Sequence, residues 1–125
     1  MSKLRSHKDL DLWKFAMQLA KQTYLASANF PKEEIYGLTA QIRRAAASVP
    51  SNIAEGAARK GSKEFCHFLY IALGSLAELE TQWIISQDLG YTASTSLENN
   101  IERVRMMLLG MIRHLKSNQS PTPNA

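Results

Sequence analysis

Apolar residues recur along this chain at steps of three and four positions, and no stretch alternates with the two-residue period of a strand. Four amphipathic stretches are separated by short segments that contain glycine, serine or proline. Short connections between amphipathic helices are typical of antiparallel bundles, so the pattern predicts an all-α, up-down-up-down four-helix bundle. The expected helices run approximately over Asp9–Ala28, Pro31–Ile53, Ser62–Leu89 and Thr95–Leu115.

Each expected helix has an apolar face that we assign to the core. Glu33 and Glu34 behind Pro31 suit the positive end of the second helix, and Ser62 is a plausible N-cap of the third. The assigned core faces are, in chain order, Trp13, Met17, Ala20 and Tyr24 with Leu12, Phe15 and Leu19 beside them; Ile35, Leu38, Ile42, Ala45, Val49 and Ile53; Phe65, Phe68, Leu69, Ala72, Leu76, Leu79 and Trp83; and Leu97, Ile101, Val104, Leu108, Met111 and Leu115.

The segment SVPSNIAEG, residues 48–56, decides the form of the second helix. The apolar phase continues unbroken through Val49 and Ile53, as it does in one continuous helix. Pro50 removes a backbone hydrogen bond at a cost of about 3 kcal/mol, so we expect a kink there. In the alternative the helix breaks, and Asn52 caps a new helix with Glu55 as its capping-box partner. The unbroken phase favours the kinked continuous helix.

A stripe of polar and charged side chains lies opposite the apolar face of this helix. Small residues flank the stripe and leave room for another backbone, and a serine hydroxyl can bond a carbonyl that the proline leaves free. Two interpretations stay open, an oligomer or partner interface and an ordinary solvated face. The candidate interface residues are Arg44, Ser48, Ser51 and Glu55, at spacings of four, three and four.

The third and fourth helices also carry apolar or small residues on the faces that should meet solvent. Such faces are normally charged and polar, so two apolar backs predict a second buried surface and hence self-association. The alternative is a core register that is wrong by one position. The residues on these backs are Tyr70, Ile71, Gly74, Ala77 and Ile85 in the third helix and Met106, Met107 and Gly110 in the fourth; Tyr70, Gly74, Met106 and Gly110 are the interface candidates among them.

Length and composition allow one domain of ordinary globular character. The chain has 125 residues, of which 45% are hydrophobic and 21% charged, and we expect the bundle over 1–117 with a disordered polar tail over 118–125. The single cysteine, Cys66, excludes an internal disulfide and fits a reducing cytosol. No apolar run has the length of a membrane span, so we expect a cytoplasmic protein that does not bind membranes.

The sequence offers little catalytic chemistry. The three histidines His7, His67 and His114 do not pair with another His or Cys at helical spacing, apart from adjacent Cys66 and His67, whose side chains diverge on a helix. Glu64 and His67 have the Glu-x-x-His spacing, but His67 falls on the back of the third helix, and no glycine-rich phosphate loop or GxSxG motif is present. We therefore expect a non-catalytic protein without a cofactor, a metal or a small-molecule substrate, in which Cys66 is a buried structural thiol.

The basic residues suggest a polyanionic partner. The formal net charge is +4, which permits binding to nucleic acid without requiring it. No platform of aromatic and basic residues is evident, which argues against base-specific readout. The alternative is that these are ordinary solvated side chains. The candidate nucleic-acid-binding residues are Arg43, Arg59, Lys60, Lys63, Arg105, Arg113 and Lys116, with Lys3, Arg5 and Lys8 as an additional N-terminal arm.

Three blocks, QIRRAAASVPSNIAEGAAR, SKEFCHFLYIALGSLAELETQ and LGY, resemble the bacterial four-helix bundle proteins encoded in intervening sequences of 23S rRNA genes, also called the S23 ribosomal protein family. DLDLWKFAMQLAKQTY and FPKEEIYGL match as well, so the resemblance extends from Asp9 to about Leu115. It implies a ring-like homopentamer. It also implies kinship with an accessory protein of the reverse transcriptase in diversity-generating retroelements, and hence RNA, DNA or a nucleic-acid enzyme as partner. A protein-interaction scaffold without nucleic acid is the second hypothesis.

Overall fold

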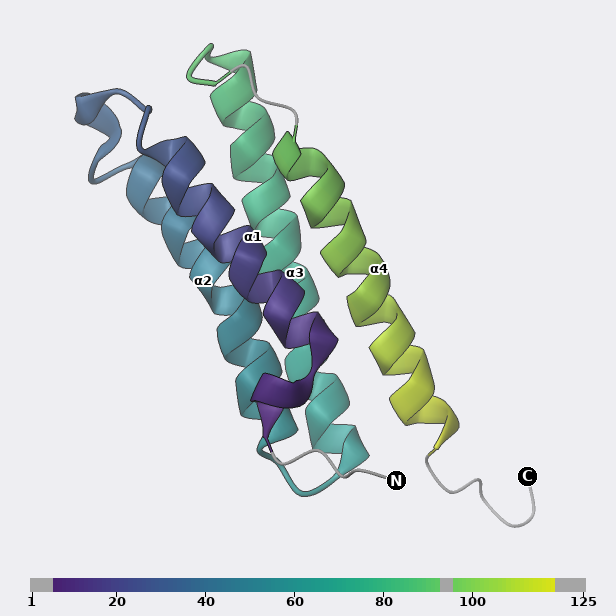
Figure 1. Cartoon of the computed structure of the whole chain (residues 1–125). Helices are drawn as coiled ribbons and strands as arrows, with labels where there is room; N and C mark the ends of the chain where they lie inside the picture. Colours follow the sequence, from purple (N-terminus) through teal and green to yellow (C-terminus); the bar gives the residue numbers. More distant parts are fainter. Residues whose placement is uncertain (1–5, 93–95, 119–125) are drawn as a thin grey trace.

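The computed structural model describes residues 6–92 and 96–118. Within these ranges the chain forms α1 (Asp11–Ser27), α2 (Leu38–Ala57), α3 (Ser62–Asp88) and α4 (Ser96–Ser117), with the short 3-10 helices η1 (His7–Asp9) and η2 (Lys32–Glu34) before α1 and α2 (Figure 1). No strand occurs among the described residues. The prediction of an all-α protein built from four helices is confirmed. Residues 1–5, 93–95 and 119–125, which include the N-terminal cations Lys3 and Arg5, Thr95 and most of the expected tail, lie outside the described residues.

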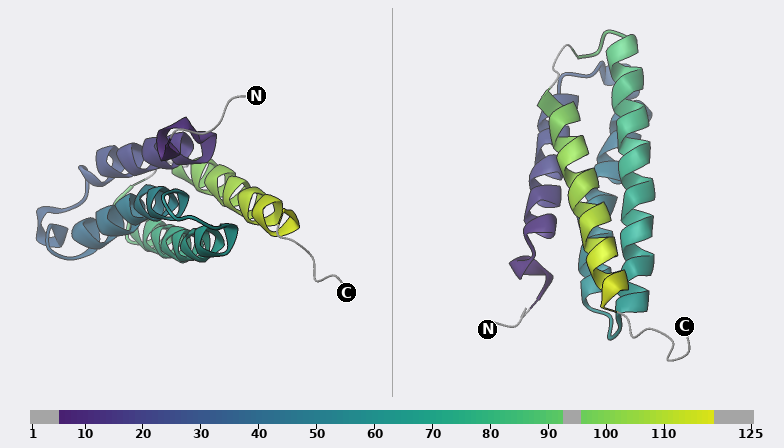
Figure 2. Two further views of the ribbon diagram at one scale, coloured as in Figure 1. Left: turned by 90° about the horizontal axis from the view of Figure 1, so that it is seen from below. Right: turned by 90° about the vertical axis from the view of Figure 1, so that its right-hand side faces the viewer.

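Successive helices run in opposite directions, so the chain crosses the bundle four times (Figures 1 and 2). Helix α2 packs against α1 and α3, and α4 closes the arrangement against α3 and α1. This order brings η1, the α2–α3 turn and the C-terminal end of α4 to one end of the bundle. The η2 segment, the C-terminal end of α3 and the first turn of α4 lie at the opposite end (Figure 1). Groups that are distant in sequence therefore meet at each end.

The core is formed by the predicted faces of α2, α3 and α4, together with Leu12, Ala16 and Leu19 of α1. Trp83, Leu108 and Ile42 are fully enclosed, and Cys66 is a buried free thiol, as expected. Burial of large apolar side chains provides the main favourable free energy of folding. The other predicted core residues that the structure buries in these helices are Ala45, Val49, Ile53, Leu69, Ala72, Leu76, Leu79, Leu97, Ile101 and Val104.

The predicted face of α1 is wrong by about one position. Met17 and Tyr24 are 44% and 45% exposed, whereas Thr23 and Ser27 are buried. The Thr23 hydroxyl donates to the Leu19 carbonyl at 2.8 Å and the Ser27 hydroxyl to the Tyr24 carbonyl at 3.2 Å. Because these hydroxyls are satisfied within their own helix, they can enter the core without an unpaired donor.

Helix α2 begins later than the sequence predicts. Gly37 is its N-cap, and Ile35 and Tyr36 are 51% and 94% exposed, so Ile35 is not part of the core. The Glu34 carboxylate accepts the Leu38 backbone N–H at 3.0 Å and the Tyr91 hydroxyl at 2.8 Å. These two hydrogen bonds, with the Leu38 bond as the larger cause, lower the pKa of Glu34, and the bond to Glu34 raises the pKa of Tyr91. Glu34 thus caps α2 from a separate 3-10 turn.

Pro50 lies inside a continuous α2, which confirms that interpretation against the two-helix alternative. Asn52 does not cap a new helix, because its side-chain amide donates to the Ser48 carbonyl at 2.8 Å. The Ser51 hydroxyl likewise donates to the Ala47 carbonyl at 2.8 Å. The carbonyl that Pro50 leaves without its usual donor is that of Ala46, and these two side chains bond the two carbonyls that follow it. The kink itself stays a prediction.

The α2–α3 turn and the end of α3 depend on glycines in three different ways. Gly61, not Ser62, is the N-cap of α3, and the cap makes no side-chain hydrogen bond. Gly90 has φ 77°, the left-handed conformation that commonly follows a helix, after the expected end at Leu89. At Gly56, a Cβ atom would lie 2.8 Å from Phe68 Cβ and 2.9 Å from Phe65 Cδ1. The absent side chain at Gly56 therefore permits the close approach of α2 and α3.

Candidate nucleic-acid interface and assembly surfaces

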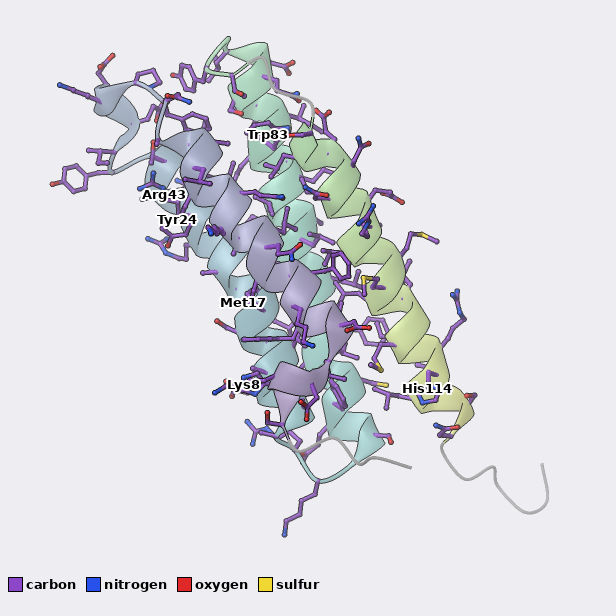
Figure 3. The ribbon with its side chains drawn as sticks, viewed as in Figure 1. Lys8, Met17, Tyr24, Arg43, Trp83 and His114 are labelled. Atoms are coloured by element: carbon purple, nitrogen blue, oxygen red, sulfur yellow. The ribbon has the colours of Figure 1, made fainter. Side chains whose placement is uncertain are left out.

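Five of the seven candidate cations lie at one end of the bundle. Arg59 and Lys60 follow α2, Lys63 is in the first turn of α3, and Arg113 and Lys116 are in the last turns of α4. The antiparallel arrangement brings these segments together, and Figure 3 places Lys8 and His114 at the same end. All five side chains are exposed. We call Arg59, Lys60, Lys63, Arg113 and Lys116 the basic end.

Two cations of the basic end lie over aromatic rings. The Arg59 guanidinium carbon is 4.8 Å from the centre of the Phe68 ring, and Lys116 Nζ is 5.1 Å from that of Tyr70. Lys116 Nζ also donates to the Tyr70 hydroxyl oxygen at 2.7 Å, and this hydrogen bond is the main reason that the pKa of Lys116 is raised. Cations over ring faces keep their charge available to a ligand while the ring holds the side chain in place.

A cavity of about 520 Å³ adjoins the first of these pairs. It is lined by Arg59, Lys63, Glu64, His67 and Phe68, and the His67 ring meets the Phe68 ring edge-on with 5.4 Å between centres. The sequence-based expectation that aromatic and basic residues do not gather is therefore wrong at this position. Arg59 and Phe68 belong to different elements, and only the turn at Gly61 and the close crossing at Gly56 bring them into contact.

Arg43 and Arg105 do not belong to the basic end. Arg43 Nε donates to the Ser27 hydroxyl at 2.8 Å, and its guanidinium lies over Tyr24, so this side chain connects α2 to α1. Arg105 forms ion pairs with Glu80 at 2.6 Å and Glu102 at 3.0 Å. Both side chains are half-buried and have partners on another helix, which leaves them less available to an external phosphate than the exposed cations of the basic end.

The four candidate interface residues of α2 have different surroundings. The Ser48 hydroxyl is half-buried and lies 2.8 Å from the Ser75 hydroxyl of α3, so Ser48 does not face outward as predicted. Arg44 and Ser51 are exposed. Glu55 pairs with Arg59, four residues further along the chain, at 3.1 Å, so its carboxylate has a partner within its own subunit.

The exposed part of the stripe borders an apolar groove between α1 and α2. One hollow of about 330 Å³ and a neighbouring one of about 670 Å³ share Ala47 and Ser51 in their walls. Figure 3 shows Met17 and Tyr24 on the α1 side of this region. The misassigned face of α1 is thus an exposed apolar wall. The first hollow is lined by Trp13, Met17, Ala20, Ala47, Pro50, Ser51 and Ala54.

The outward face of α3 is apolar, as predicted. Tyr70, Ile71 and Ile85 are 47%, 39% and 42% exposed, and Gly74 has open space around it. The buried positions of α3 match the predicted core, so an error of register does not explain this surface. The expected back of α4 is confirmed only in part, because Met106 is 55% exposed but Met107 packs partly against the core. Gly110 is half-exposed with open space around it.

The described residues contain no group of three or more His, Cys, Asp or Glu side chains placed to hold a metal ion. Within the same ranges, no helix combines the length and apolarity that a membrane span requires.

Arg103 lies over Phe15 with 5.4 Å to the ring centre, a third contact between an arginine of one element and a ring of another. The surface is thus described by its charges and apolar faces.

The fold and surfaces define an all-helical bundle protein with a basic end and two exposed apolar faces. The family model described as 23S rRNA-intervening sequence protein matches residues 8–110, and the chain belongs to this family. The match confirms the resemblance drawn from the SVPSNIAEG and ALGSLAELET blocks, both of which lie inside it. No curated protein matches the chain.

Proposed function

We propose that this protein is a non-catalytic homo-oligomer that binds nucleic acid through its basic end. The observation that carries the proposal is the gathering of Arg59, Lys60, Lys63, Arg113 and Lys116 from three segments onto one end. Each phosphate neutralised by a cation releases counterions, so several cations on one surface add to affinity and to its salt dependence. An oligomer multiplies this surface within one particle.

Charge reversal tests the basic end directly. We expect Lys60→Glu with Lys63→Glu to abolish binding of a short labelled single-stranded RNA, measured by fluorescence anisotropy over a range of salt concentrations. The affinity of the native protein should fall steeply with salt, with a slope of roughly 0.7 per phosphate contact for a single strand. The matched control, Lys21→Glu with Lys32→Glu, reverses the same charge at two exposed lysines away from the basic end.

Equal binding by the native protein and the Lys60/Lys63 variant would contradict this assignment. A similar loss in the control variant would mean that net charge alone determines binding. Salt-independent binding would also be inconsistent with phosphate contacts as the main source of affinity.

The exposed apolar face of α3 supports the oligomer. Exposed apolar side chains at Tyr70, Ile71 and Ile85 along one helix are costly to leave in water, and a second copy can cover them. We expect light scattering after size exclusion to give a mass several times that of the 14.0 kDa chain. Ile71→Glu should reduce this mass, whereas Leu25→Glu, which changes a 65% exposed leucine of α1, should not. A native 14.0 kDa monomer would overturn the oligomer.

The second candidate is a protein-interaction scaffold, favoured by the groove between α1 and α2. The small residues Ala47 and Ser51 line this groove and leave room for a helix or an extended segment of another protein. Ser51→Trp fills the groove without changing charge, since Ser51 is exposed at its edge. Loss of a salt-insensitive protein complex in this variant, with RNA binding unchanged, would favour the scaffold over the nucleic-acid binder.

A further inference from the structure

We propose that the cavity beside Phe68 binds one unpaired nucleotide, with the base stacked against the Arg59–Phe68 pair and the phosphate held by Lys63 and Arg59. This inference rests on the proposed function, because it names the part of a nucleic acid that the basic end accepts. The observation that carries it differs from the one behind the proposed function: aromatic rings, cations and a cavity converge at one place.

The size and walls of the cavity fit a small planar ligand. Its volume of about 520 Å³ lies within the range of roughly 300–1,000 Å³ that is usual for small-molecule sites. Phe68 is half-buried and firmly placed, because its Cβ lies close to the α2 backbone at Gly56. The exposed His67 ring extends the aromatic wall edge-on at 5.4 Å. A nucleobase has a flat face that stacks on such surfaces whatever its identity.

The Arg59 guanidinium adds a second stacking plane. It lies 4.8 Å above the Phe68 ring, and a guanidinium is itself planar and stacks on aromatic systems. Only Nη2 of Arg59 contacts Glu55, at 3.1 Å, so the other N–H donors of the group can turn toward a phosphate. Ring, guanidinium and base can thus form one stack, which an isolated lysine patch could not provide.

The charges around the cavity favour an anion over a neutral ligand. Lys63 and Arg59 line it, the latter paired with Glu55, and the N-cap of α3, Gly61, makes no side-chain hydrogen bond to the first N–H groups of the helix. Glu64 also lines the cavity and opposes a phosphate. We therefore expect Glu64→Gln to tighten nucleotide binding. An unchanged or weaker affinity in that variant would overturn the position we assign to the phosphate.

The ring is tested by Phe68→Leu, measured by anisotropy with a single-stranded RNA and with a fully paired hairpin of equal length. We expect single-strand affinity to fall by about 5- to 150-fold, the contribution of one stacked base, while hairpin affinity changes little. The matched control is Phe15→Leu, because Phe15 is also half-buried beneath an arginine but lies outside the cavity. Circular dichroism and thermal unfolding verify that both variants fold.

A second variant removes the plane and keeps the charge. Arg59→Lys should lose affinity for the single strand but retain the salt slope, since lysine supplies the same charge without a stacking surface. A similar loss for single strand and hairpin in Phe68→Leu, or a loss no greater than in Phe15→Leu, would overturn the stacking site. An unchanged affinity in Arg59→Lys would do the same for the arginine.

A nucleotide can reach this cavity as part of a strand or as a free molecule, and titration with adenosine 5′-monophosphate and adenosine distinguishes the two. Shifts of the Phe68 ring resonances by the monophosphate at low concentration, and by adenosine only weakly, support the nucleotide site. If the monophosphate binds and RNA does not, the cavity accepts free nucleotides and the proposed function fails. If RNA binds without any dependence on Phe68, the proposed function stands and this inference fails.

Discussion

The two ends of the bundle use their polar side chains in opposite ways. At the end that contains η2 and the C-terminal end of α3, Glu34 accepts hydrogen bonds from Leu38 and Tyr91. Glu98 accepts from the Trp83 indole N–H at 3.3 Å and from the Gln87 amide. We call this the closed end. At the basic end, Arg59 and Lys116 lie over exposed or half-exposed rings, and Lys60, Lys63 and Arg113 face solvent.

The closed end therefore contributes mainly to stability, and the basic end mainly to the proposed binding. Carboxylates at the closed end satisfy N–H and O–H groups of the fold, so they connect elements that the chain joins only through loops. Cations at the basic end satisfy few groups of the fold and therefore remain available to a ligand. Substitutions at the closed end should change the free energy of unfolding, and most substitutions at the basic end should change binding instead.

The largest expected effect is at Trp83, which is fully buried at the closed end. Trp83→Ala should reduce the free energy of unfolding by about 3–5 kcal/mol, because it removes a large core side chain and leaves a cavity. Urea unfolding followed by circular dichroism measures it. The control, Trp13→Ala, removes an indole from the half-exposed groove wall and should cost less. Equal losses would contradict the packing described for Trp83.

Gly56 is an exception among the positions near the basic end, because a substitution here should change stability as well as binding. The helices α2 and α3 are closely packed at this position. Gly56→Ala should cost about 1–3 kcal/mol, since the added Cβ would meet Phe68 and Phe65 below 3.0 Å. It should also move Phe68 and so weaken single-strand RNA binding.

Gly74→Ala is the matched control for Gly56→Ala, because nothing lies within 4 Å of its added Cβ. In a single subunit, replacing an open glycine inside a helix should raise the free energy of unfolding by roughly 0.5–1 kcal/mol. The same urea unfolding experiment measures both glycine variants. A destabilised Gly74→Ala would mean that another subunit approaches α3 at this position.

The smallest effect, at Glu34, depends on pH. Its lowered pKa means that its contribution to stability is present above the pKa of the unfolded chain, about 4.3, and is lost as pH falls through the folded-state pKa. Glu34→Gln should therefore be less stable than the native protein at neutral pH, and the difference should vanish in acid. Glu33→Gln, on the exposed neighbour, should change little. A difference that persists in acid would contradict the capping role.

The sequence predicted the fold better than the sites because helix faces are local patterns. In α2, α3 and α4 the apolar positions that recur at steps of three and four are mostly the ones that the structure buries. In α1 the stripe is broad, and Thr23 and Ser27 enter the core with hydroxyls bonded inside the helix, which polarity alone does not indicate. The start of α2 was missed because its cap, Glu34, precedes the helix by a separate turn.

Part of the candidate site could be predicted from the sequence. Lys60 and Lys63 are close in sequence and were both candidate nucleic-acid-binding residues, and the apolar back of α3 followed from its period. The pairing of Arg59 with Phe68 could not be predicted, and neither could that of Lys116 with Tyr70, because each contact joins separate elements. From the sequence alone, Arg43 and Arg105 could not be distinguished from the other candidate cations, because their partners lie on other helices.

The sequence by itself determined that this chain forms four amphipathic helices, that Pro50 lies within a continuous one, and that apolar residues remain on the back of α3. These are properties of period and composition, which each segment carries alone. Only the tertiary structure decided which cations are free, which are neutralised, and which lie over rings beside a cavity. Those properties depend on distances between elements. The most important of these is the close distance between α2 and α3 at Gly56.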